Sequence, residues 1–442
     1  MIEYNNNNRN LNRDREQYDA SNRDRINKDR LRRRQEKVRK EKMMIITVFF
    51  TFVVIIALSI FSCGSAKSEN RGAKHVTKKG CTAFYPKKTG KFGKEFAKEL
   101  AGSGKKDVVF DYKESNLNDF HIYYYGKGKG FMTDKEYDPV TIKELTDESK
   151  MIISDHLRYT MKKKNRDEAY TSKFMEETYY DTISLERFTY GFNDKNLICN
   201  FPEYKINVYI PYEYIADILS ADIGVKKAEY KKPVYVDPER PVIALTFDDG
   251  PDVVADSTER ILNELYKYDG VGTFFIVGRN LGDGVVPVLE KGIRYGNQYG
   301  SHSTTHPELP KLEEGEILSE VMYVSDFFKE KLGYTMDTYR PPYGEYNEKV
   351  DGVVPLAAVL WDVDSLDWKL RDGPAIVEQI KSTMFNKAVV LLHDIHVPSA
   401  QAVCDNGLVK MLIDEGYQLV DIDTLAKLRE VELTQGVHLC WD

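Results

Sequence analysis

Side chains able to perform acid–base and metal chemistry gather in the second half of the chain. Asp248 and Asp249 follow the β-rich run 242–247, and Gly250 and Pro251 then turn the chain. Alone, Asp-Asp-Gly-Pro is typical of a solvated turn, because all four residue types favour turns. More polar residues come after similar runs downstream: His302, His306, Arg340, Asp364, Asp367, Trp368, His393 and Asp394. This recurrence favours a reactive site over a chance turn.

The spacing of His302 and His306 is typical of metal ligands, and Asp249 can supply a third donor. Pro307 disfavours a helical conformation at His306, so we expect the pair on a turn. Two histidines and one carboxylate leave open positions on an ion for water and substrate. The same donor set describes non-haem iron oxygenases. Those enzymes usually have antiparallel jelly rolls, which the alternating strands and helices of this chain do not suggest.

Asp248 is a candidate general base, since one carboxylate of an adjacent pair can bind an ion while the other takes a proton. Arg340 can keep such a base ionised and oriented through a bidentate contact, and a surface salt bridge is the alternative role. His393 ends an apolar strand and suits a general acid. Asp367 is available as the carboxylate partner that would raise the pKa of His393, with N-capping as its alternative role.

Strands and helices alternate from residue 242 onward. The expected strands are 242–247, 272–277, 297–301, 335–339, 357–361, 388–392 and 417–421. The expected helices are 257–268, 283–294, 313–332, 373–384 and 405–415. Seven strands with intervening helices in under 200 residues predict a distorted, incomplete (β/α) barrel. Each reactive group would then lie at the carboxyl end of a strand, the face that carries active sites in such barrels.

Five motifs appear in order within residues 240–430: T-F-D-D-G-P, H-S-T-T-H, R-P-P-Y-G, D-S-L-D-W and L-L-H-D. Together they resemble the polysaccharide deacetylases, the family-four carbohydrate esterases whose catalytic module is the NodB homology domain. The resemblance implies hydrolysis of an N-acetyl group, with acetate and a free amino sugar as products. It covers under half of the chain, and none of the motifs carries a substitution.

The resemblance also implies roles for ten residues. Asp248 would be the catalytic base, and Arg340 would orient it. His393 would be the general acid, and Asp367 would tune its pKa. The ligands of a divalent metal, most often Zn²⁺ with Co²⁺ or Mn²⁺ as alternatives, are Asp249, His302 and His306. The backbone N–H of Tyr343 would help to form the oxyanion site. Leu391 and Trp368 would line the pocket for the acetyl methyl group.

The net charge of −7 is unevenly distributed along the 442 residues. Residues 1–42 hold 14 Lys/Arg against 8 Asp/Glu and few apolar residues, so we expect a basic disordered segment. Residues 43–66 hold no charge and are long enough for one transmembrane helix. The basic flank predicts a single-pass type II protein whose remainder lies outside the cell. A cleaved signal peptide, or a lipoprotein signal at Cys63, is the alternative.

The expected order after the membrane helix is a linker at 67–80, an extracellular α+β domain of unknown function at 81–230, a proline-rich linker at 231–241 and the catalytic domain at 242–442. Within the α+β domain we expect strands at 108–112 and 121–125, a helix at 142–164 and two strands within 188–210. The alternation of Gly126, Gly128 and Gly130 with lysine favours a hairpin turn over a phosphate loop.

Four cysteines follow the membrane segment, in a compartment where disulfides persist. Domain order favours the pairs Cys81–Cys199 and Cys404–Cys440. No C-x-x-C motif occurs, so we expect no cysteine-based zinc site. The acidic bulk of the chain argues against nucleic acid as a partner, because phosphate binding needs concentrated positive charge.

We therefore expect a membrane-anchored, outward-facing, metal-dependent deacetylase of N-acetylglucosamine in the glycan strands of peptidoglycan. One alternative is a deacetylase of another acetylated polysaccharide, such as chitin, an exopolysaccharide or xylan. Another is a wall-binding or sensing protein that works through residues 81–230. The motifs indicate the reaction and leave the polymer open.

Overall fold

The structure, a computed structural model, describes residues 73–440. The expected basic segment 1–42 and transmembrane helix 43–66 lie outside the described residues. Within 73–440, no helix has both the length and the apolar character needed to cross a bilayer. Lys74–Asp442 forms one compact unit, distinct from Met1–Ala73.

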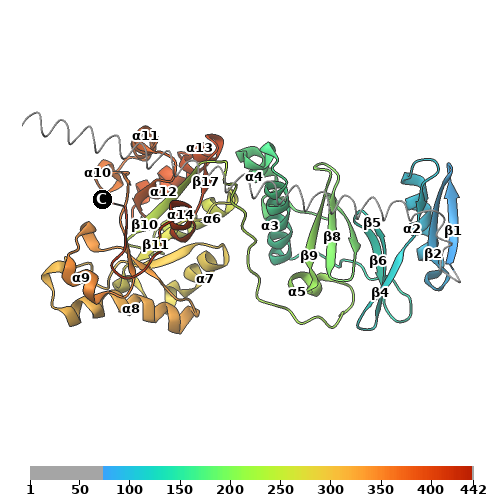
Figure 1. Cartoon of the computed structure of the whole chain (residues 1–442), viewed down its shortest axis with the longest axis horizontal. Helices are drawn as coiled ribbons and strands as arrows, with labels where there is room; N and C mark the ends of the chain where they lie inside the picture. The colour runs from blue at the N-terminus through green and yellow to red at the C-terminus, as the bar shows by residue number, and fades with distance from the viewer. Residues whose placement is uncertain (1–72, 441–442) are drawn as a thin grey trace, which may run out of the picture. The chain divides into compact units, whose positions relative to one another are not determined.

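The amino-terminal part of the larger unit contains three small three-stranded sheets (Figure 1). The first consists of β1 (Ala73–Lys78), β2 (Cys81–Pro86) and β3 (Val109–Phe110). The second consists of β4 (Lys113–Leu117), β5 (Phe120–Gly126) and β6 (Lys129–Thr133). The third consists of β7 (Thr189–Phe192), β8 (Asn196–Phe201) and β9 (Ile206–Pro211). The α-helices of this part are α2 (Gly90–Ser103), α3 (Asp147–Lys163), α4 (Ser172–Glu177) and α5 (Tyr212–Ile215).

Secondary structure in this part differs from the sequence prediction at four places. The expected helix 142–164 begins only at Asp147, because Thr146 caps α3. The expected strand 108–112 is reduced to β3 (Val109–Phe110). β1 occupies six residues of the expected linker 67–80, because Val76 packs against the small core around Ala83 and Leu100. The span 188–210 holds three strands instead of two, because a second turn before β9, with Lys205 at φ 51°, reverses the chain again. The predicted hairpin is confirmed, since β5 and β6 pair up to Gly126 and Lys129.

The predicted disulfide pairs Cys81–Cys199 and Cys404–Cys440 are wrong, because all four described cysteines are free thiols. Cys81 and Cys199 are fully buried in separate sheets, on β2 and β8. The Cys440 thiol donates instead to the Asp362 carboxylate, at 3.4 Å. The predicted partners therefore form no bond with one another. The order of domains along the chain does not predict which cysteines meet in space.

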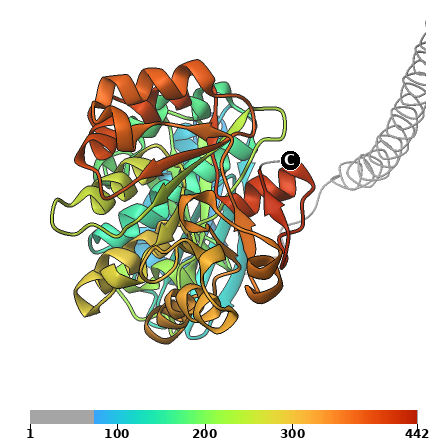
Figure 2. The same cartoon turned by 90° about the vertical axis from the view of Figure 1, so that its left-hand side faces the viewer.

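The carboxyl-terminal part is built on a nine-stranded sheet. Its strands are β10 (Val242–Asp248), β11 (Thr273–Ile276), β12 (Gln298–Ser301), β13 (Thr338–Tyr339), β14 (Ala357–Val359), β15 (Val363–Asp364), β16 (Val389–His393), β17 (Gln418–Leu419) and β18 (His438–Leu439). Helices lie around the outside of these strands (Figure 2). They are α6 (Ser257–Lys267), α7 (Val286–Arg294), α8 (Glu314–Leu332), α9 (Glu348–Val353), α10 (Asp367–Leu370), α11 (Gly373–Thr383), α12 (Val397–Cys404), α13 (Leu408–Asp414) and α14 (Ile422–Arg429).

The strands pair in parallel, in the order β15-β16-β10-β11-β12-β13-β14-β18, with β17 beside the start of β10. β14 and β15 stand near opposite ends of this order, yet only residues 360–362 separate them along the chain. The two ends of the sheet must therefore approach each other, which curls the sheet without closing it. The predicted incomplete (β/α) barrel is confirmed.

β10 lies between β16 and β11, and every one of its residues is buried. Its run Val-Ile-Ala-Leu-Thr-Phe suits a strand covered on both faces, as parallel sheets require. β10 pairs with β16 in a register that sets Asp248 opposite His393. β12 pairs with β13 through Ser301 and Tyr339, each of which immediately precedes a predicted site residue. The parallel register thus brings the reactive residues to one edge of the sheet.

A fully buried arginine on α3 joins the α+β part to the catalytic part. The Arg158 guanidinium donates to Tyr266 O at 3.1 Å and to Lys267 O at 3.0 Å. Both carbonyls belong to the last turn of α6, where intrahelical donors are missing and the helix dipole is negative. One turn earlier on α3, the carboxylate of Asp155 accepts from the Tyr266 hydroxyl at 2.9 Å.

Replacing Arg158 by methionine is expected to lower the free energy of unfolding by about 2–3 kcal/mol. The reason is that the hydrogen bonds of the guanidinium to Tyr266 O, Lys267 O, Met175 O and Thr178 Oγ1 are lost. Urea denaturation of the full-length chain measures this change. Arg294→Met removes an exposed arginine from the end of α7 and should alter stability by less than about 0.5 kcal/mol. Equal effects of the two substitutions would show that the buried contacts contribute nothing.

Candidate active site

Asp249, His302 and His306 bring three donor atoms within 4.8 Å of one another. Oδ1 of Asp249 lies 3.7 Å from His302 Nε2 and 3.5 Å from His306 Nε2. This oxygen is buried and has no hydrogen-bond partner among the described residues. A buried carboxylate oxygen is costly to leave unpaired, and a cation between it and two imidazole nitrogens would satisfy it. The donor set therefore fits a divalent metal.

The tautomer of His302 also suits a metal ligand. Its Nδ1 lies 2.8 Å from Arg340 O, and a carbonyl can only accept, so Nδ1 carries the proton. Nε2 is then left with a free lone pair on the side of Asp249. Burial lowers the pKa of His302 to about 3, so the ring is neutral, as ligation requires.

The backbone around the donors adopts conformations that are uncommon outside glycine. Asp249, Ser303 and His306 have φ values of 73°, 63° and 64°. Such left-handed conformations cluster at functional sites, where surrounding contacts maintain them. The predicted turn at His306 is confirmed, since residues 302–306 lie outside any helix. Next to Asp249, a Cβ on Gly250 would lie 2.3 Å from the Asp394 carboxylate, so only glycine fits there.

Glu320 on α8 holds the loop between the two histidines. Its Oε2 accepts from the backbone N–H groups of Thr304 at 2.9 Å and Thr305 at 2.8 Å. Its Oε1 accepts from the Thr305 hydroxyl at 2.9 Å. One carboxylate thus fastens two consecutive loop residues, immediately before His306. We regard Glu320 as a positioning residue for the metal ligands.

Glu320→Gln is expected to weaken binding of a divalent metal, with Zn²⁺ as the probe, by about 10- to 100-fold, the usual cost of losing a residue that orients a ligand. The amide replaces one acceptor oxygen by a donor, which opposes the N–H groups of the loop. A competition titration against a chromophoric chelator measures the affinity. Glu330→Gln, on an exposed position of the same helix, is the matched control. Unchanged zinc affinity in Glu320→Gln would contradict the positioning role.

Asp248 and Arg340 form a buried pair beside the donor set. Asp248 is 2% exposed and Arg340 is 0% exposed. Arg340 Nη1 donates to Asp248 Oδ1 at 2.7 Å, while Oδ2 lies 3.6 Å from His302 Nε2. Burial raises the pKa of Asp248, and the charge of Arg340 opposes that rise. The carboxylate therefore has one anchored oxygen and one that faces the donors.

The predicted bidentate contact of Arg340 is wrong, because its other N–H groups are already engaged. Nε donates to Val359 O at 2.9 Å, Nη2 to Leu360 O at 2.8 Å, and Nη1 also to Thr246 Oγ1 at 2.8 Å. Val359 is the last residue of β14, and Leu360 begins the short connection to β15. Arg340 thus orients the Asp248 carboxylate and also connects it by hydrogen bonds to the backbone at the end of β14.

His393 and Asp367 form the second charged pair. Nδ1 of His393 lies 2.8 Å from Asp367 Oδ1, and the His393 N–H donates to Oδ2 at 2.8 Å. The Ser399 hydroxyl donates to the same Oδ2 at 2.6 Å, and the Trp368 N–H donates to Oδ1 at 2.8 Å, so four contacts hold this carboxylate. Burial acts to lower the pKa of His393, but the hydrogen bond and charge of Asp367 outweigh it and raise the pKa to about 9. The ring is therefore protonated at neutral pH.

One cavity of about 470 Å³ unites these groups. Its lining consists of Asp248, Asp249, His302, His306, Pro341, Tyr343, Trp361, Asp364, Trp368, Leu391, His393 and His396. Tyr343 and Trp368 are 61% and 49% exposed, whereas Leu391 is only 5% exposed. Arg340 and Asp367 are not part of this lining, but each is hydrogen-bonded to a lining residue, Arg340 to Asp248 and Asp367 to His393. The structure thus brings all ten predicted site residues together.

Besides Pro341, Trp361 and Asp364 of the lining, four more residues at or behind the cavity are not among the ten predicted site residues. His396 lines it, and its ring centroid lies 5.6 Å from that of His393. Asn280 donates its side-chain N–H to Asp249 O at 2.6 Å, and Ser399 and Glu320 act as described above. His396 follows His393 by three residues, so H-D-I-H was a usable signal. Asn280, Ser399 and Glu320 carry no such pattern.

Comparison with known proteins identifies relatives of the carboxyl-terminal part of the chain. The family model for polysaccharide deacetylase matches residues 235–357. Peptidoglycan-N-acetylmuramic acid deacetylase PdaC of Bacillus subtilis is 37% identical over 195 residues, which cover 44% of this chain and 41% of the relative. Peptidoglycan-N-acetylglucosamine deacetylase PgdA of Listeria monocytogenes is 35% identical over 185 residues, which cover 41% of this chain and 38% of the relative.

A peptidoglycan-N-acetylglucosamine deacetylase of Bacillus cereus is 33% identical over 193 residues, which cover 41% of this chain and 68% of the relative. The chain therefore belongs to the polysaccharide deacetylase family. The match spans only about two fifths of the length of the Bacillus subtilis and Listeria relatives.

Proposed function

We propose that this protein is a metal-dependent hydrolase that removes the N-acetyl group from N-acetylglucosamine in peptidoglycan. The observation that carries the proposal is the pair of charged groups beside the donor set. Asp248 is oriented by Arg340, and His393 is protonated through Asp367, at one cavity. Hydrolysis of an amide needs a base for water and an acid for the leaving nitrogen. The peptidoglycan substrates of the relatives support the choice of polymer.

Asp249, His302 and His306 would hold the ion, for which we propose Zn²⁺, and the ion would supply Lewis-acid polarisation of the acetamide carbonyl and of water. Asp248 accepts the proton of the water molecule that adds to the carbonyl carbon, through the oxygen that Arg340 leaves free. His393 donates its Nε2 proton to the departing nitrogen, because an amide nitrogen leaves poorly as an anion. The products are acetate and a free amino sugar.

Three residues of the cavity contact the acetyl group in this proposal. The backbone N–H of Tyr343 donates to the oxygen that becomes negative as water adds. Leu391 and Trp368 border the acetyl methyl group. Leu391 is almost fully buried and Trp368 is half exposed, which suits an apolar floor and a wall at the mouth.

We further propose that the chain is anchored in the cell membrane by residues 43–66, with the catalytic domain outside the cell. The uncharged run and its basic cytoplasmic flank support this topology. Such an anchor would keep the enzyme beside its wall substrate. Protease treatment of intact cells should remove the catalytic domain and spare the amino-terminal segment, and full protection would contradict the topology.

Acetate release from isolated peptidoglycan tests the proposed reaction. The full-length chain should release acetate, lose that activity with a chelator and regain it with Zn²⁺. Chitin oligosaccharides and acetylated xylan, tested in parallel, address the other polymers. Release from either of these but not from peptidoglycan would move the substrate assignment while keeping the reaction.

N-acetylmuramic acid is the second candidate sugar, because the relative with 37% identity is a peptidoglycan-N-acetylmuramic acid deacetylase. Digestion of treated peptidoglycan to disaccharides, followed by mass spectrometry, locates the free amine on one sugar or the other. A free amine on muramic acid would replace the proposed substrate residue.

A further inference from the structure

The first lobe of the described chain, residues 73–110, is strongly basic, whereas the chain after it is acidic. This lobe contains β1, β2, α2 and β3 and has its own small core around Ala83 and Leu100. It holds ten lysines, no arginine and three carboxylates, a net charge of +7. Residues 111–442 hold 37 Lys/Arg and 58 Asp/Glu, a net charge of −21. We call residues 73–110 the lysine lobe.

All ten lysines of the lobe are exposed: Lys74, Lys78, Lys79, Lys87, Lys88, Lys91, Lys94, Lys98, Lys105 and Lys106. Within the described part of the chain none of them forms an ion pair, and Lys150 is the first lysine that does. Glu95 lies four residues after Lys91 and three before Lys98, spacings at which ion pairs form on helices. No such pair forms here, so the positive charge of the lobe is uncompensated.

The lysines of α2 form one stripe. At 100° per residue, Lys91, Lys94 and Lys98 fall within about 60° of one another around the helix. The buried Ala97, Leu100 and Ala101 mark the adjoining side of the helix, with Ala101 next to Lys94. Lys94 and Lys98 are like charges at i,i+4, an arrangement that destabilises an isolated helix.

The stripe continues onto the neighbouring strand. The Lys78 ammonium on β1 lies 3.7 Å from the point where a Cβ on Gly102 would stand, beside the end of α2. The charge therefore spreads over several elements of one lobe. Such a distribution suits a charged plane, because a small anion would need donors that converge on one point.

We propose that the lysine lobe docks on the anionic lipid headgroups of the membrane surface. Two observations select this partner: the uncompensated charge, and the position of the lobe in the chain. β1 begins seven residues after the predicted membrane segment 43–66 ends, which limits the reach to about 25 Å. Each lysine near an anionic bilayer strengthens binding by about fivefold. This inference rests on the proposed membrane anchor.

The charge asymmetry has a consequence for the enzyme. A surface that attracts the lysine lobe repels the part of the chain with a charge of −21. The catalytic domain would therefore be directed away from the bilayer, toward its polymer.

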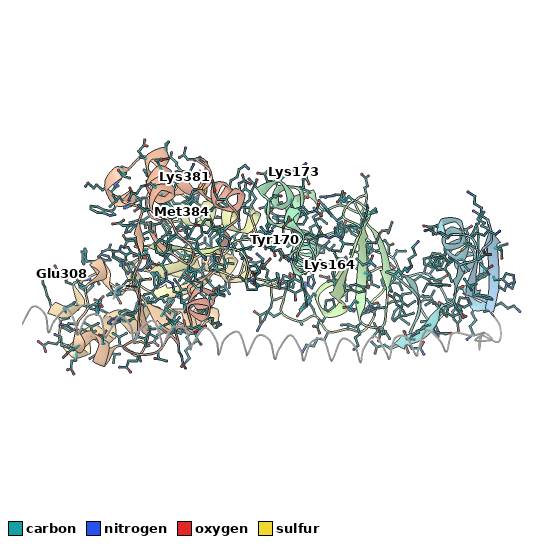
Figure 3. The ribbon with its side chains drawn as sticks, turned by 45° about the horizontal axis from the view of Figure 1, so that its top comes forward. Lys164, Tyr170, Lys173, Glu308, Lys381 and Met384 are labelled. Carbon is teal, nitrogen blue, oxygen red and sulfur yellow. The ribbon has the colours of Figure 1, made fainter. Side chains whose placement is uncertain are left out.

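Lysine reactivity in the full-length chain tests the proposal. The chain is mixed with vesicles of phosphatidylcholine alone, or with about 30% phosphatidylglycerol, and acetylation of each lysine is followed by mass spectrometry. On anionic vesicles, acetylation of Lys91, Lys94 and Lys98 should slow at least fivefold and recover in about 0.5 M NaCl, which screens the attraction. Lys164, after α3, and Lys381, on α11, should react equally with both vesicles (Figure 3).

Two triple variants distinguish an effect of the lysine lobe from an effect of the net charge of the whole chain. Replacing Lys91, Lys94 and Lys98 by glutamine should lower the anionic-over-neutral vesicle partition ratio at least tenfold. Replacing the exposed Lys164, Lys329 and Lys381 by glutamine changes the net charge equally and should leave the ratio unchanged. Circular dichroism confirms that both variants fold, and both should release acetate as the parent does.

Three results would overturn the inference. They are equal acetylation on both kinds of vesicle, equal effects of the two triple variants, and protection by a soluble phosphate polymer but not by vesicles. The last result would assign the lobe to a wall polymer instead. If the full-length chain does not bind neutral vesicles, the proposed membrane anchor is contradicted. If the unsubstituted chain releases no acetate from peptidoglycan, the proposed function is contradicted. Neither of these affects the comparison of anionic with neutral vesicles.

Discussion

Replacing Asp248 by asparagine is expected to lower kcat for acetate release about 10³-fold, within the range that a general base contributes. This corresponds to about 4 kcal/mol of lost transition-state stabilisation. The amide oxygen can still accept from Arg340, so the fold is retained, but the side chain can no longer take a proton from water. Acetate release from peptidoglycan, measured at saturating substrate, gives the change.

Zinc content and a surface control complete this experiment. The Asp248→Asn variant should bind Zn²⁺ as the parent does, because the three donors are other residues. Asp283→Asn, at a side chain that is 91% exposed, should keep full activity. A kcat within threefold of the parent for Asp248→Asn would remove Asp248 from the mechanism.

Replacing Asp367 by asparagine is expected to shift the alkaline limb of the pH–rate profile to lower pH. The parent should stay active up to about pH 9, because His393 acts as an acid only while protonated and its pKa is raised to about 9. Without the Asp367 carboxylate, burial dominates and lowers the pKa of His393. At pH 8 the ring is then mostly neutral, and the rate should fall about 10²-fold or more.

Ser399→Ala provides the graded comparison. It removes the 2.6 Å hydrogen bond to Asp367 and leaves the carboxylate against His393 in place. We expect a smaller rate loss and an alkaline limb close to that of the parent. A limb that stays at about pH 9 in Asp367→Asn would show that another group sets it.

The long elements of the catalytic domain follow directly from sequence periodicity. The predicted helices 257–268 and 313–332 match α6 (Ser257–Lys267) and α8 (Glu314–Leu332) almost residue for residue. β15 and β18 hold two residues each, too few for any period to emerge. The predicted helix 405–415 begins late, as α13, because Gly407 at φ 72° separates it from α12. Short elements depend on the surrounding packing more than on their own residues.

Residues that perform chemistry were predictable from the sequence, whereas most of the residues that position them were not. The ten predicted site residues belong to short motifs, so their types and spacing are visible in the chain. Glu320 lies 15 or 16 residues from the threonines it holds, and Ser399 lies 32 residues from Asp367. Contacts across such separations exist only once helices pack on the sheet.

Residue types and their positions after successive strands were enough to predict the type of chemistry, because acids, histidines and an arginine at the ends of parallel strands meet at one edge of the sheet. The motif resemblance already implied different roles for the two adjacent acids, and the tertiary structure showed how the backbone divides them between two sets of partners. Asp248 remains within the strand and is paired with Arg340, while Asp249, at φ 73°, turns out of it toward the two histidines. That division depends on backbone torsion and long-range packing, which residue types do not record.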